Sequence, residues 1–315
     1  MYTRANTCTI CKRRKTFFFR PYSGQSLCQK CFTESIETKI RVTIAKYKMF
    51  SYSDKVVVAI SGGKDSLGLL NVLATIQETK PKASLIAFSV DEGIRGYRDE
   101  ALEIATENCR KLGMKHHVVS FKELFGLTLD DIVERKKRNA ESKLTACAYC
   151  GVLRRRALNE AALRVGANKL ATAHTLDDEA QTMLMNILRG DLVRLTKGKP
   201  VTDSVHARFV QKVKPFCEIL EKESALYAYV KNITFQATPC PYASEALRND
   251  LRDMLNSMED KHPGTKFALA SSIERLQPAL EKTLEKSDFR ECSRCGEPAA
   301  ASGLCKVCEM LGEIP

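Results

Sequence analysis

The sequence KVVVAISGGKDS, from Lys55 to Ser66, constrains the fold of this chain more than any other stretch. Five of its first six residues are apolar and three are valine, which is typical of a short strand buried on both faces. Two glycines then let the backbone turn sharply and approach a ligand, while two serines and a lysine add hydroxyls and a cation. Apolar spacing over residues 67–75 predicts a helix, whose N-terminus favours anions. The stretch therefore predicts a phosphate-binding turn between a strand and a helix.

The turn differs from the common P-loop, because Asp65 stands where a hydroxyl residue should follow the lysine. The string SGGKDS instead resembles the PP-loop of the N-type ATP pyrophosphatase families, which split ATP into AMP and pyrophosphate while they adenylate a substrate. An ordinary surface turn with two glycines is the alternative interpretation, and the flanking strand and helix argue against it.

The composition indicates a soluble cytoplasmic protein. The chain has 315 residues, of which 44% are hydrophobic, enough for a sizeable core and about two domains. No apolar run reaches the ~20 residues that span a bilayer, and the N-terminus MYTRAN lacks a secretory signal, so no membrane partner is expected. The formal net charge is +12. Two four-thiolate zinc sites would reduce it to roughly +8, which is compatible with RNA binding.

Cysteine pairs near both ends of the chain have the spacing of zinc ribbons. Thirteen cysteines in an intracellular protein indicate metal ligands rather than disulfides. Two Cys-x-x-Cys pairs complete one tetrahedral site, and a redox dithiol is the alternative. Phe17 to Phe19, which follow basic residues, either stack on RNA bases or fill the ribbon core. The predicted ligands of two structural Zn²⁺ ions are Cys8, Cys11, Cys28 and Cys31, and Cys292, Cys295, Cys305 and Cys308.

Between the ribbons, apolar runs alternate with helical patterns, which implies an α/β fold with a doubly wound parallel sheet and ligands at the carboxyl ends of its strands. Further strands are predicted at 84–90, 116–121, 169–174 and 208–216, with helices at 98–112 and 152–165. The predicted domains are a zinc ribbon (1–33), a basic helical linker (34–53), a PP-loop ATP-binding catalytic domain (54–243), a helical segment (244–290) and a second zinc ribbon (291–315).

The carboxyl ends of these strands carry further candidate residues. The backbone around Val90 is placed to meet adenine, and Ala173, at the carboxyl end of the fourth strand, is a second predicted nucleotide contact. Three acids, Asp177 to Glu179, open the next helix, where they satisfy the helix dipole or face a triphosphate. We favour Asp178 as a ligand of Mg²⁺.

A separate set of three cysteines cannot form an ordinary local zinc site. Cys147 and Cys150 form a pair before a predicted helix, and Cys240 stands far along the chain between two prolines. Three cysteines can hold a [4Fe-4S] cluster and leave the fourth iron open to an exogenous sulfide. A catalytic dithiol that carries a persulfide and a three-cysteine zinc site remain alternatives. Cys109 and Cys217 are more simply explained as packed thiols.

Taken together, these motifs resemble the tRNA 2-thiouridine synthetases of the archaeal and eukaryotic cytosolic type, over essentially the whole chain. The resemblance implies ATP, Mg²⁺ near Asp65 and Asp178, two structural zinc ions, a [4Fe-4S] cluster on the three cysteines, and a homodimer. It implies tRNA as a partner, with free sulfide or a ubiquitin-like sulfur-carrier protein as the sulfur donor. By the same resemblance, the phosphates of ATP would be held by Ala59, Ile60, Ser61, Gly62, Gly63, Lys64, Asp65 and Ser66.

One position departs from part of this family. Where some members place a catalytic lysine four residues after the second cluster cysteine, this chain has Arg154. Arginine clamps phosphate but stays protonated, which favours a charge-stabilising role over a role as a base. The departure resembles the wobble-uridine branch of the family more than the T-loop branch.

The function hypothesis is an ATP-dependent tRNA uridine 2-sulfurtransferase that adenylates the uridine 2-oxygen, replaces it with sulfur and releases AMP and pyrophosphate. The catalytic candidates are Cys147, Cys150, Cys240, Arg154 and Asp178. One rival is a non-catalytic RNA-binding scaffold whose ATP fold senses nucleotide. A second rival is a tRNA 2-thiocytidine synthetase, against which the paired terminal ribbons speak by resemblance.

Overall fold

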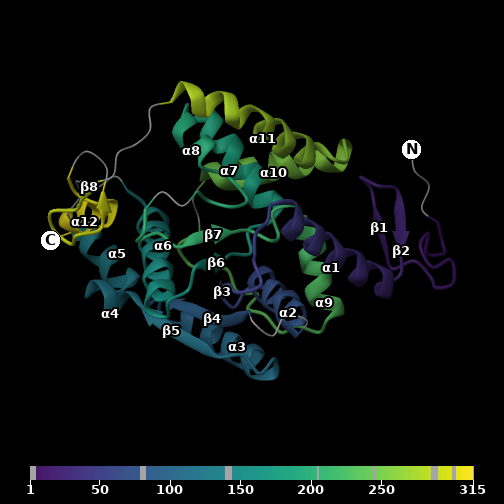
Figure 1. The fold of residues 1–315 in the computed structure, drawn as a ribbon, viewed down its shortest axis with the longest axis horizontal. Helices are drawn as coiled ribbons and strands as arrows, with labels where there is room; N and C mark the ends of the chain where they lie inside the picture. The colour runs from purple at the N-terminus through teal and green to yellow at the C-terminus, as the bar shows by residue number, and fades with distance from the viewer. Residues whose placement is uncertain are drawn as a thin grey trace.

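The computed structural model describes residues 5–78, 83–138, 144–203, 206–243, 246–284, 290–299 and 303–314. Its centre is a parallel sheet with the strand order β5-β4-β3-β6-β7 (Figure 1). The strands are β3 (Lys55–Ala59), β4 (Ser84–Asp91), β5 (His116–Ser120), β6 (Lys169–Ala171) and β7 (Gln211–Val213). The order starts in the middle and winds outward in both directions, so the predicted doubly wound parallel sheet is confirmed.

Both faces of the sheet are covered, which explains the unbroken apolar run of β3. Val56 and Val58 pack into one core, to which α2 (Lys64–Glu78), α3 (Arg98–Lys111) and α9 (Glu221–Val230) contribute. Val57 packs into the other core with α4 (Phe121–Phe125), α5 (Leu129–Arg138) and α6 (Ala146–Arg164). The strand is buried from two sides, as its valines predict.

Three predicted strands are longer than the observed ones, and the third exceeds the observed strand by one residue, since β5 ends at Ser120. The fourth ends at Ala171 rather than residue 174. The fifth runs only over Gln211–Val213, because Asn159 holds the backbone of Arg208 and Val210 in a turn (2.7 and 2.9 Å). Pro215, soon after the strand, has no N–H to donate to a sheet.

Helices beyond the sheet form a third group, seen along the top of Figure 1. They are α7 (Leu176–Leu188), α8 (Leu192–Thr196), α10 (Ala246–Lys261) and α11 (Thr265–Thr283). Lys266 of α11 reaches back to the buried carboxylate of Asp177 at the start of α7, so these helices are tied to the edge of the sheet that carries the predicted site. Among the described residues, no helix combines the length and apolarity that crossing a membrane requires.

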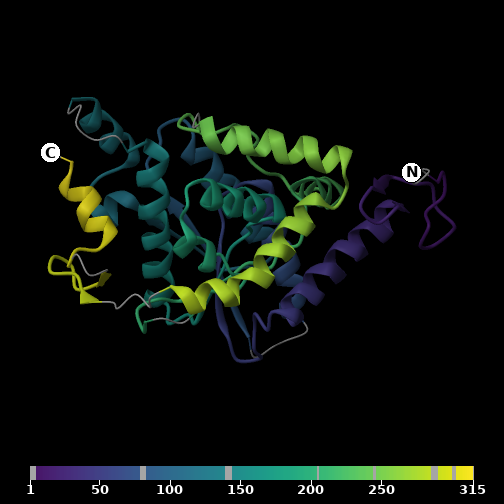
Figure 2. The ribbon, with the colours of Figure 1, turned by 90° about the horizontal axis from the view of Figure 1, so that it is seen from above.

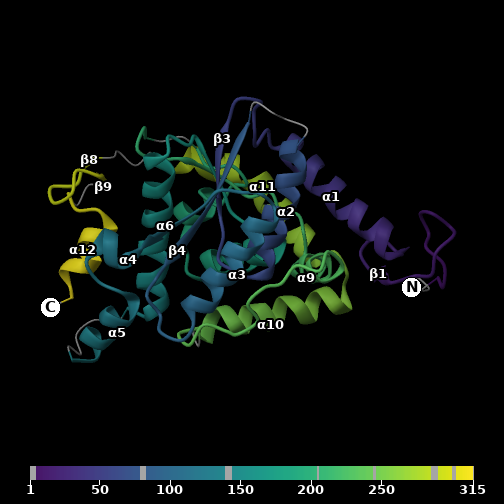
Figure 3. The same cartoon turned by 90° about the horizontal axis from the view of Figure 1, so that it is seen from below.

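The two ribbon modules lie at opposite ends of the long axis in all three views (Figures 1 to 3). The N-terminal module contains β1 (Phe18–Arg20) and β2 (Gln25–Leu27) and continues directly into α1 (Gln29–Lys46). The linker helix therefore begins inside the ribbon rather than after it. The C-terminal module contains β8 (Arg290–Glu291), β9 (Pro298–Ala299) and α12 (Lys306–Gly312), which packs beside α6.

Candidate active site

The turn after β3 is shaped by its own hydroxyls. The Ser61 amide donates to Ser66 Oγ (3.1 Å), and that hydroxyl donates to the Gly63 carbonyl (2.9 Å). Gly62 has a φ of +87°, and a Cβ on it would lie 2.5 Å from the carbonyl oxygen of Ala101. Only glycine fits there, because both the backbone conformation and the neighbouring helix exclude a side chain. The sequence motif thus folds into the compact strand–turn–helix that it predicts.

One oxygen at this turn has spare capacity for a cation. Lys64 Nζ contacts Asp65 Oδ2 (2.9 Å) and Glu221 Oε1 (2.8 Å). The other oxygen, Asp65 Oδ1, is buried beside the Ser224 hydroxyl, but the two oxygens are not aligned as a hydrogen bond, and neither has another partner among the described residues. Burial raises the pKa of Asp65, and the charge of Lys64 opposes this. A buried acceptor without a partner suits a magnesium ligand, and the assignment stays a prediction.

Cys147 and Cys150 lie in the first turn of α6, not before it as the sequence predicts. The helix starts early because the Thr145 hydroxyl accepts a hydrogen bond from the Ala148 amide (3.2 Å) and caps it. The thiol of Cys150 is buried, which raises its pKa to about 11 against the opposing charge of Arg154.

The segment that carries Cys240 crosses the same end of the sheet. The Gln236 amide donates to the Gly62 carbonyl (2.9 Å), so the segment first touches the nucleotide turn. It then packs Cys240 and Tyr242 against the core around α6, and Cys147 Sγ donates to the Tyr242 carbonyl (3.1 Å). The structure therefore brings the distant cysteine segment beside the cysteine pair and the turn.

These three residues fit the predicted cluster by their chemistry. All three are cysteines outside any disulfide bond, and they come from two segments that a hydrogen bond joins. Their sulfur atoms do not meet at one point as those of a single-ion site do, which disfavours the three-cysteine zinc alternative. A cluster does not require that convergence, because each cysteine binds a different iron. The cluster ligands remain a prediction.

A network of charges that the sequence does not reveal joins the turn to the cysteine pair. Arg98 Nη1 donates to the Ser61 carbonyl (2.7 Å), and Arg154 Nη2 donates to Cys150 Sγ (3.0 Å). Both guanidiniums contact the buried carboxylate of Glu92, just beyond the end of β4. The sequence does not mark Glu92 and Arg98 as site residues, because glutamate and arginine are mostly exposed. The only sequence signal is that Glu92 directly follows a buried strand.

The acids that open α7 are each engaged. The Asp178 carboxylate accepts from the amide and hydroxyl of Thr175 (2.9 Å each) in a capping box. Asp177 accepts from the Glu221 amide (2.7 Å), and Glu179 pairs with Lys214 (2.7 Å). The dipole and capping interpretation therefore has direct support. Asp178 remains half-exposed and only loosely paired with Arg248 (3.6 Å), so its role as a magnesium ligand stays a prediction.

Cations gather on the α6 side of β7. Lys212 pairs in register with Leu170 of β6, which faces α6, and Lys214 lies two residues on, on the same face. Burial, then the charges of Lys214 and Arg155, lower the pKa of Lys212 to about 8. The Glu179 carboxylate is paired with Lys214, so it does not neutralise Lys212 and Arg155. The positive charges of these two residues can therefore bind an anion.

Val90 and Ala173 lie at the edge of the sheet that carries the turn after β3. Val90 is buried near the end of β4, and Ala173 lies two residues beyond β6. Because the strands are parallel, both lie at the same edge of the sheet as the turn. The contact of Val90 with adenine and that of Ala173 with the nucleotide stay predictions.

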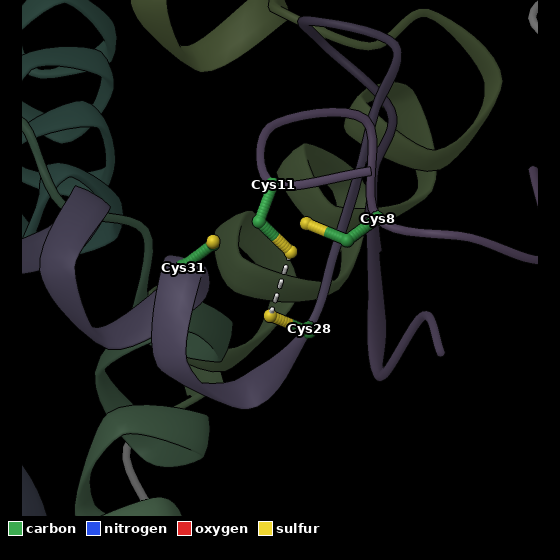
Figure 4. Close-up of side chains that lie close together, drawn as sticks. All are labelled: Cys8, Cys11, Cys28 and Cys31. Carbon is green, nitrogen blue, oxygen red and sulfur yellow. Dashed lines mark hydrogen bonds between the residues drawn. The ribbon is translucent and has the colours of Figure 1, made fainter. Parts of the chain in front are cut away.

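Both ribbon modules bring four cysteines together. In the N-terminal module the sulfur atoms converge from a loop and from the start of α1 (Figure 4), and in each module the four lie within 4.8 Å of one another. Backbone N–H groups lower the pKa of Cys8 to about 6 although burial opposes this, which favours the thiolate that a metal needs. Phe17 and Phe18 pack edge-on against Phe32 (6.2 and 5.2 Å between ring centroids), which supports the core interpretation over base stacking.

The fold and the site define a PP-loop ATP-binding protein with two terminal four-cysteine modules. The PP-loop domain family matches residues 32–259. The tRNA 2-thiolation protein NcsA of Haloferax volcanii is 35% identical over 308 residues, covering 93% of this chain and 94% of that protein. Cytoplasmic tRNA 2-thiolation protein 1 of Schizosaccharomyces pombe is 36% identical, covering 96% and 90%.

A solved structure agrees over nearly the whole length. It is the U34-tRNA thiolase NcsA from Methanococcus maripaludis with its [4Fe-4S] cluster, which has a TM-score of 0.83 and 32% identity and covers 97% of this chain and 95% of that one. The chain belongs to the PP-loop tRNA 2-thiolation protein family, and the family resemblance predicted from its sequence is confirmed.

Proposed function

We propose that this chain is an ATP-dependent tRNA sulfurtransferase that replaces the 2-oxygen of a uridine with sulfur, at the wobble position in preference to the T-loop. The observation that supports this most is the meeting of the phosphate turn and the Cys240 segment, through the Gln236 amide and the Gly62 carbonyl (2.9 Å). The names of the relatives support tRNA as the substrate, and the Methanococcus maripaludis thiolase, which is named for U34, supports the wobble position.

The turn after β3 provides the groups that adenylation needs. Backbone amides at the start of α2 bind phosphate oxygens, while Asp65 Oδ1 and Asp178 hold Mg²⁺. When ATP is bound at this turn, the 2-oxygen of the uridine attacks the α-phosphate, and pyrophosphate leaves. Adenylation turns a poor leaving group into AMP, and the turn stabilises the charge that develops.

Arg154 supplies fixed positive charge between the turn and the thiols. Partial desolvation lowers the pKa of Arg154, but the neighbouring Glu92 and Cys150 raise it by more, so the guanidinium stays protonated. It therefore stabilises the departing oxygen and takes no proton. A cluster on Cys147, Cys150 and Cys240, when bound, supplies an iron with an open coordination position for sulfide. Lys212 and Arg155 bind the tRNA backbone beside the target base.

We propose a cytoplasmic location, which the names of the relatives support. We also propose a homodimer, and free sulfide or a ubiquitin-like carrier as the sulfur donor, as the family resemblance implies. The two terminal modules are proposed to hold structural zinc, which their four-cysteine geometry supports.

The test is anaerobic reconstitution with iron and sulfide, followed by incubation with tRNA and ATP. Nucleoside analysis should find 2-thiouridine, with one AMP and one pyrophosphate formed for each. Pyrophosphate production separates this enzyme from a scaffold, and the identity of the thiolated base separates it from a thiocytidine synthetase. No thiouridine, with a cluster demonstrably bound, would defeat the proposal.

A further inference from the structure

One buried carboxylate touches both halves of the candidate site. We propose that Glu92 is a positioning residue that holds Arg98 on the nucleotide turn and Arg154 on the cysteine pair. The roles given to Arg98 at the nucleotide turn and to Arg154 at the cysteine pair rest on the proposed function. The contacts of Glu92 with both arginines are observed in the structure and do not depend on it.

The contacts form an unbroken chain from the turn to the thiol. Glu92 Oε2 lies 2.9 Å from Arg98 Nε, and Glu92 Oε1 lies 2.8 Å from Arg154 Nε. Arg98 in turn donates to the Ser61 carbonyl (2.7 Å), and Arg154 donates to Cys150 Sγ (3.0 Å). One carboxylate is therefore shared between two guanidiniums that point in different directions.

The placement of Glu92 is itself fixed by its surroundings. Its backbone carbonyl accepts a hydrogen bond from the Leu129 amide (2.7 Å). The next residue, Gly93, has a φ of +68°, and a Cβ at this position would clash with Thr128. The Glu92 side chain is only 4% exposed. A carboxylate this buried requires paired positive charges, and its negative charge in turn keeps the guanidiniums of Arg98 and Arg154 in place.

The negative charge, rather than the shape of the side chain, carries this role. Glu92 Oε2 and Arg98 Nε are close but not aligned as a hydrogen bond, so their attraction is mainly electrostatic. Without that charge, two guanidiniums would repel each other, and the Arg98 side chain (5% exposed) would lose the buried carboxylate that it contacts. The Arg154 side chain is 47% exposed and would turn toward solvent.

The test uses Glu92→Gln, which preserves shape and removes charge. In cluster-free protein we expect the Kd of a non-hydrolysable ATP analogue, measured by calorimetry, to rise about fivefold or more because the turn loses its anchor. In cluster-loaded enzyme we expect thiouridine formed per pyrophosphate released to fall about tenfold, because Arg154 leaves the thiol. A purely structural role would not lower that ratio.

The single-arginine variants separate the two ends. Arg98→Lys should weaken nucleotide binding alone, and Arg154→Gln should lower the thiouridine-to-pyrophosphate ratio alone. Glu107→Gln, an exposed acid of α3 paired with Arg110 (2.8 Å), is the matched control and should change neither. If Glu92→Gln changes only one of the two quantities, or neither, the proposal is overturned.

Thermal melting shows whether Glu92→Gln folds. If it does not fold, the double variant Arg98→Lys/Arg154→Gln provides the test. When Arg154 is removed, the Glu92 carboxylate interacts only with residue 98. The increase in the Kd of the ATP analogue caused by Arg98→Lys should therefore be smaller in the Arg154→Gln background. Strictly additive effects would overturn the link. If the wild-type enzyme makes no thiouridine, the proposed function fails, while the affinity measurements still test Glu92.

Discussion

At the residue scale, Asp178 combines two roles that substitution can separate. Its carboxylate completes the capping box at the start of α7, where Thr175 is the N-cap, and it is the proposed magnesium ligand. Asparagine keeps an oxygen acceptor for the cap, so Asp178→Asn should cost about 1 kcal/mol of unfolding free energy or less. Loss of a magnesium ligand should lower the rate of pyrophosphate release at least about 100-fold.

The control for Asp178 is another helix-capping aspartate. Asp191 caps α8 by accepting from the Arg194 amide (2.9 Å). Asp191→Asn should match Asp178→Asn in urea denaturation and leave pyrophosphate release unchanged. If Asp178→Asn were as active as Asp191→Asn, the carboxylate would be a helix cap only.

Lys212 should make tRNA binding depend on pH. Its pKa of about 8 lies below that of a free lysine because of burial and then neighbouring cations, so the side chain is charged below about pH 8 and neutral above it. The Kd of tRNA should therefore rise between about pH 7 and pH 9. Lys212→Arg keeps its charge throughout and should flatten this rise. Identical pH profiles for the two proteins, measured by filter binding, would exclude Lys212 from the tRNA site.

At the element scale, the strand–turn–helix around Gly62 could be predicted because all of its determinants are local. The valines of β3, the two glycines and the apolar spacing of α2 lie within one short stretch. The early start of α6 could not be predicted from the sequence, because it depends on a single capping hydroxyl, that of Thr145, ahead of two cysteines. The length of β7 depends on Asn159, which is distant in sequence.

Gly62→Ala tests how strictly the turn limits its residues. Alanine at φ +87° would strain the backbone and press a methyl group against Ala101, so we expect a loss of about 1–3 kcal/mol in unfolding free energy and weaker ATP binding. Gly113→Ala is the control, since it has φ +62° but nothing within 4 Å. If Gly62→Ala lost no more stability than Gly113→Ala and bound ATP normally, the packing against Ala101 would be unimportant.

At the scale of the whole molecule, the doubly wound parallel sheet and the two four-cysteine modules follow from sequence patterns. The linkage between distant parts does not. The N-terminal module is joined to the main body by Arg20 and Glu223, which pair in a buried contact of 2.6 Å. Nothing in the sequence marks these two residues, because charged side chains are ordinarily exposed. The same holds for Glu92, whose partners come from two different helices.

The central claim is that three thiols from two segments serve one site beside the nucleotide turn. Iron and sulfide content after anaerobic reconstitution tests it most directly, with Cys240→Ser compared against Cys217→Ser. Cys217 is a buried packing thiol outside the proposed site. We expect the wild type and Cys217→Ser to bind a [4Fe-4S] cluster and Cys240→Ser to lose it. Equal iron and sulfide in all three proteins would contradict the account.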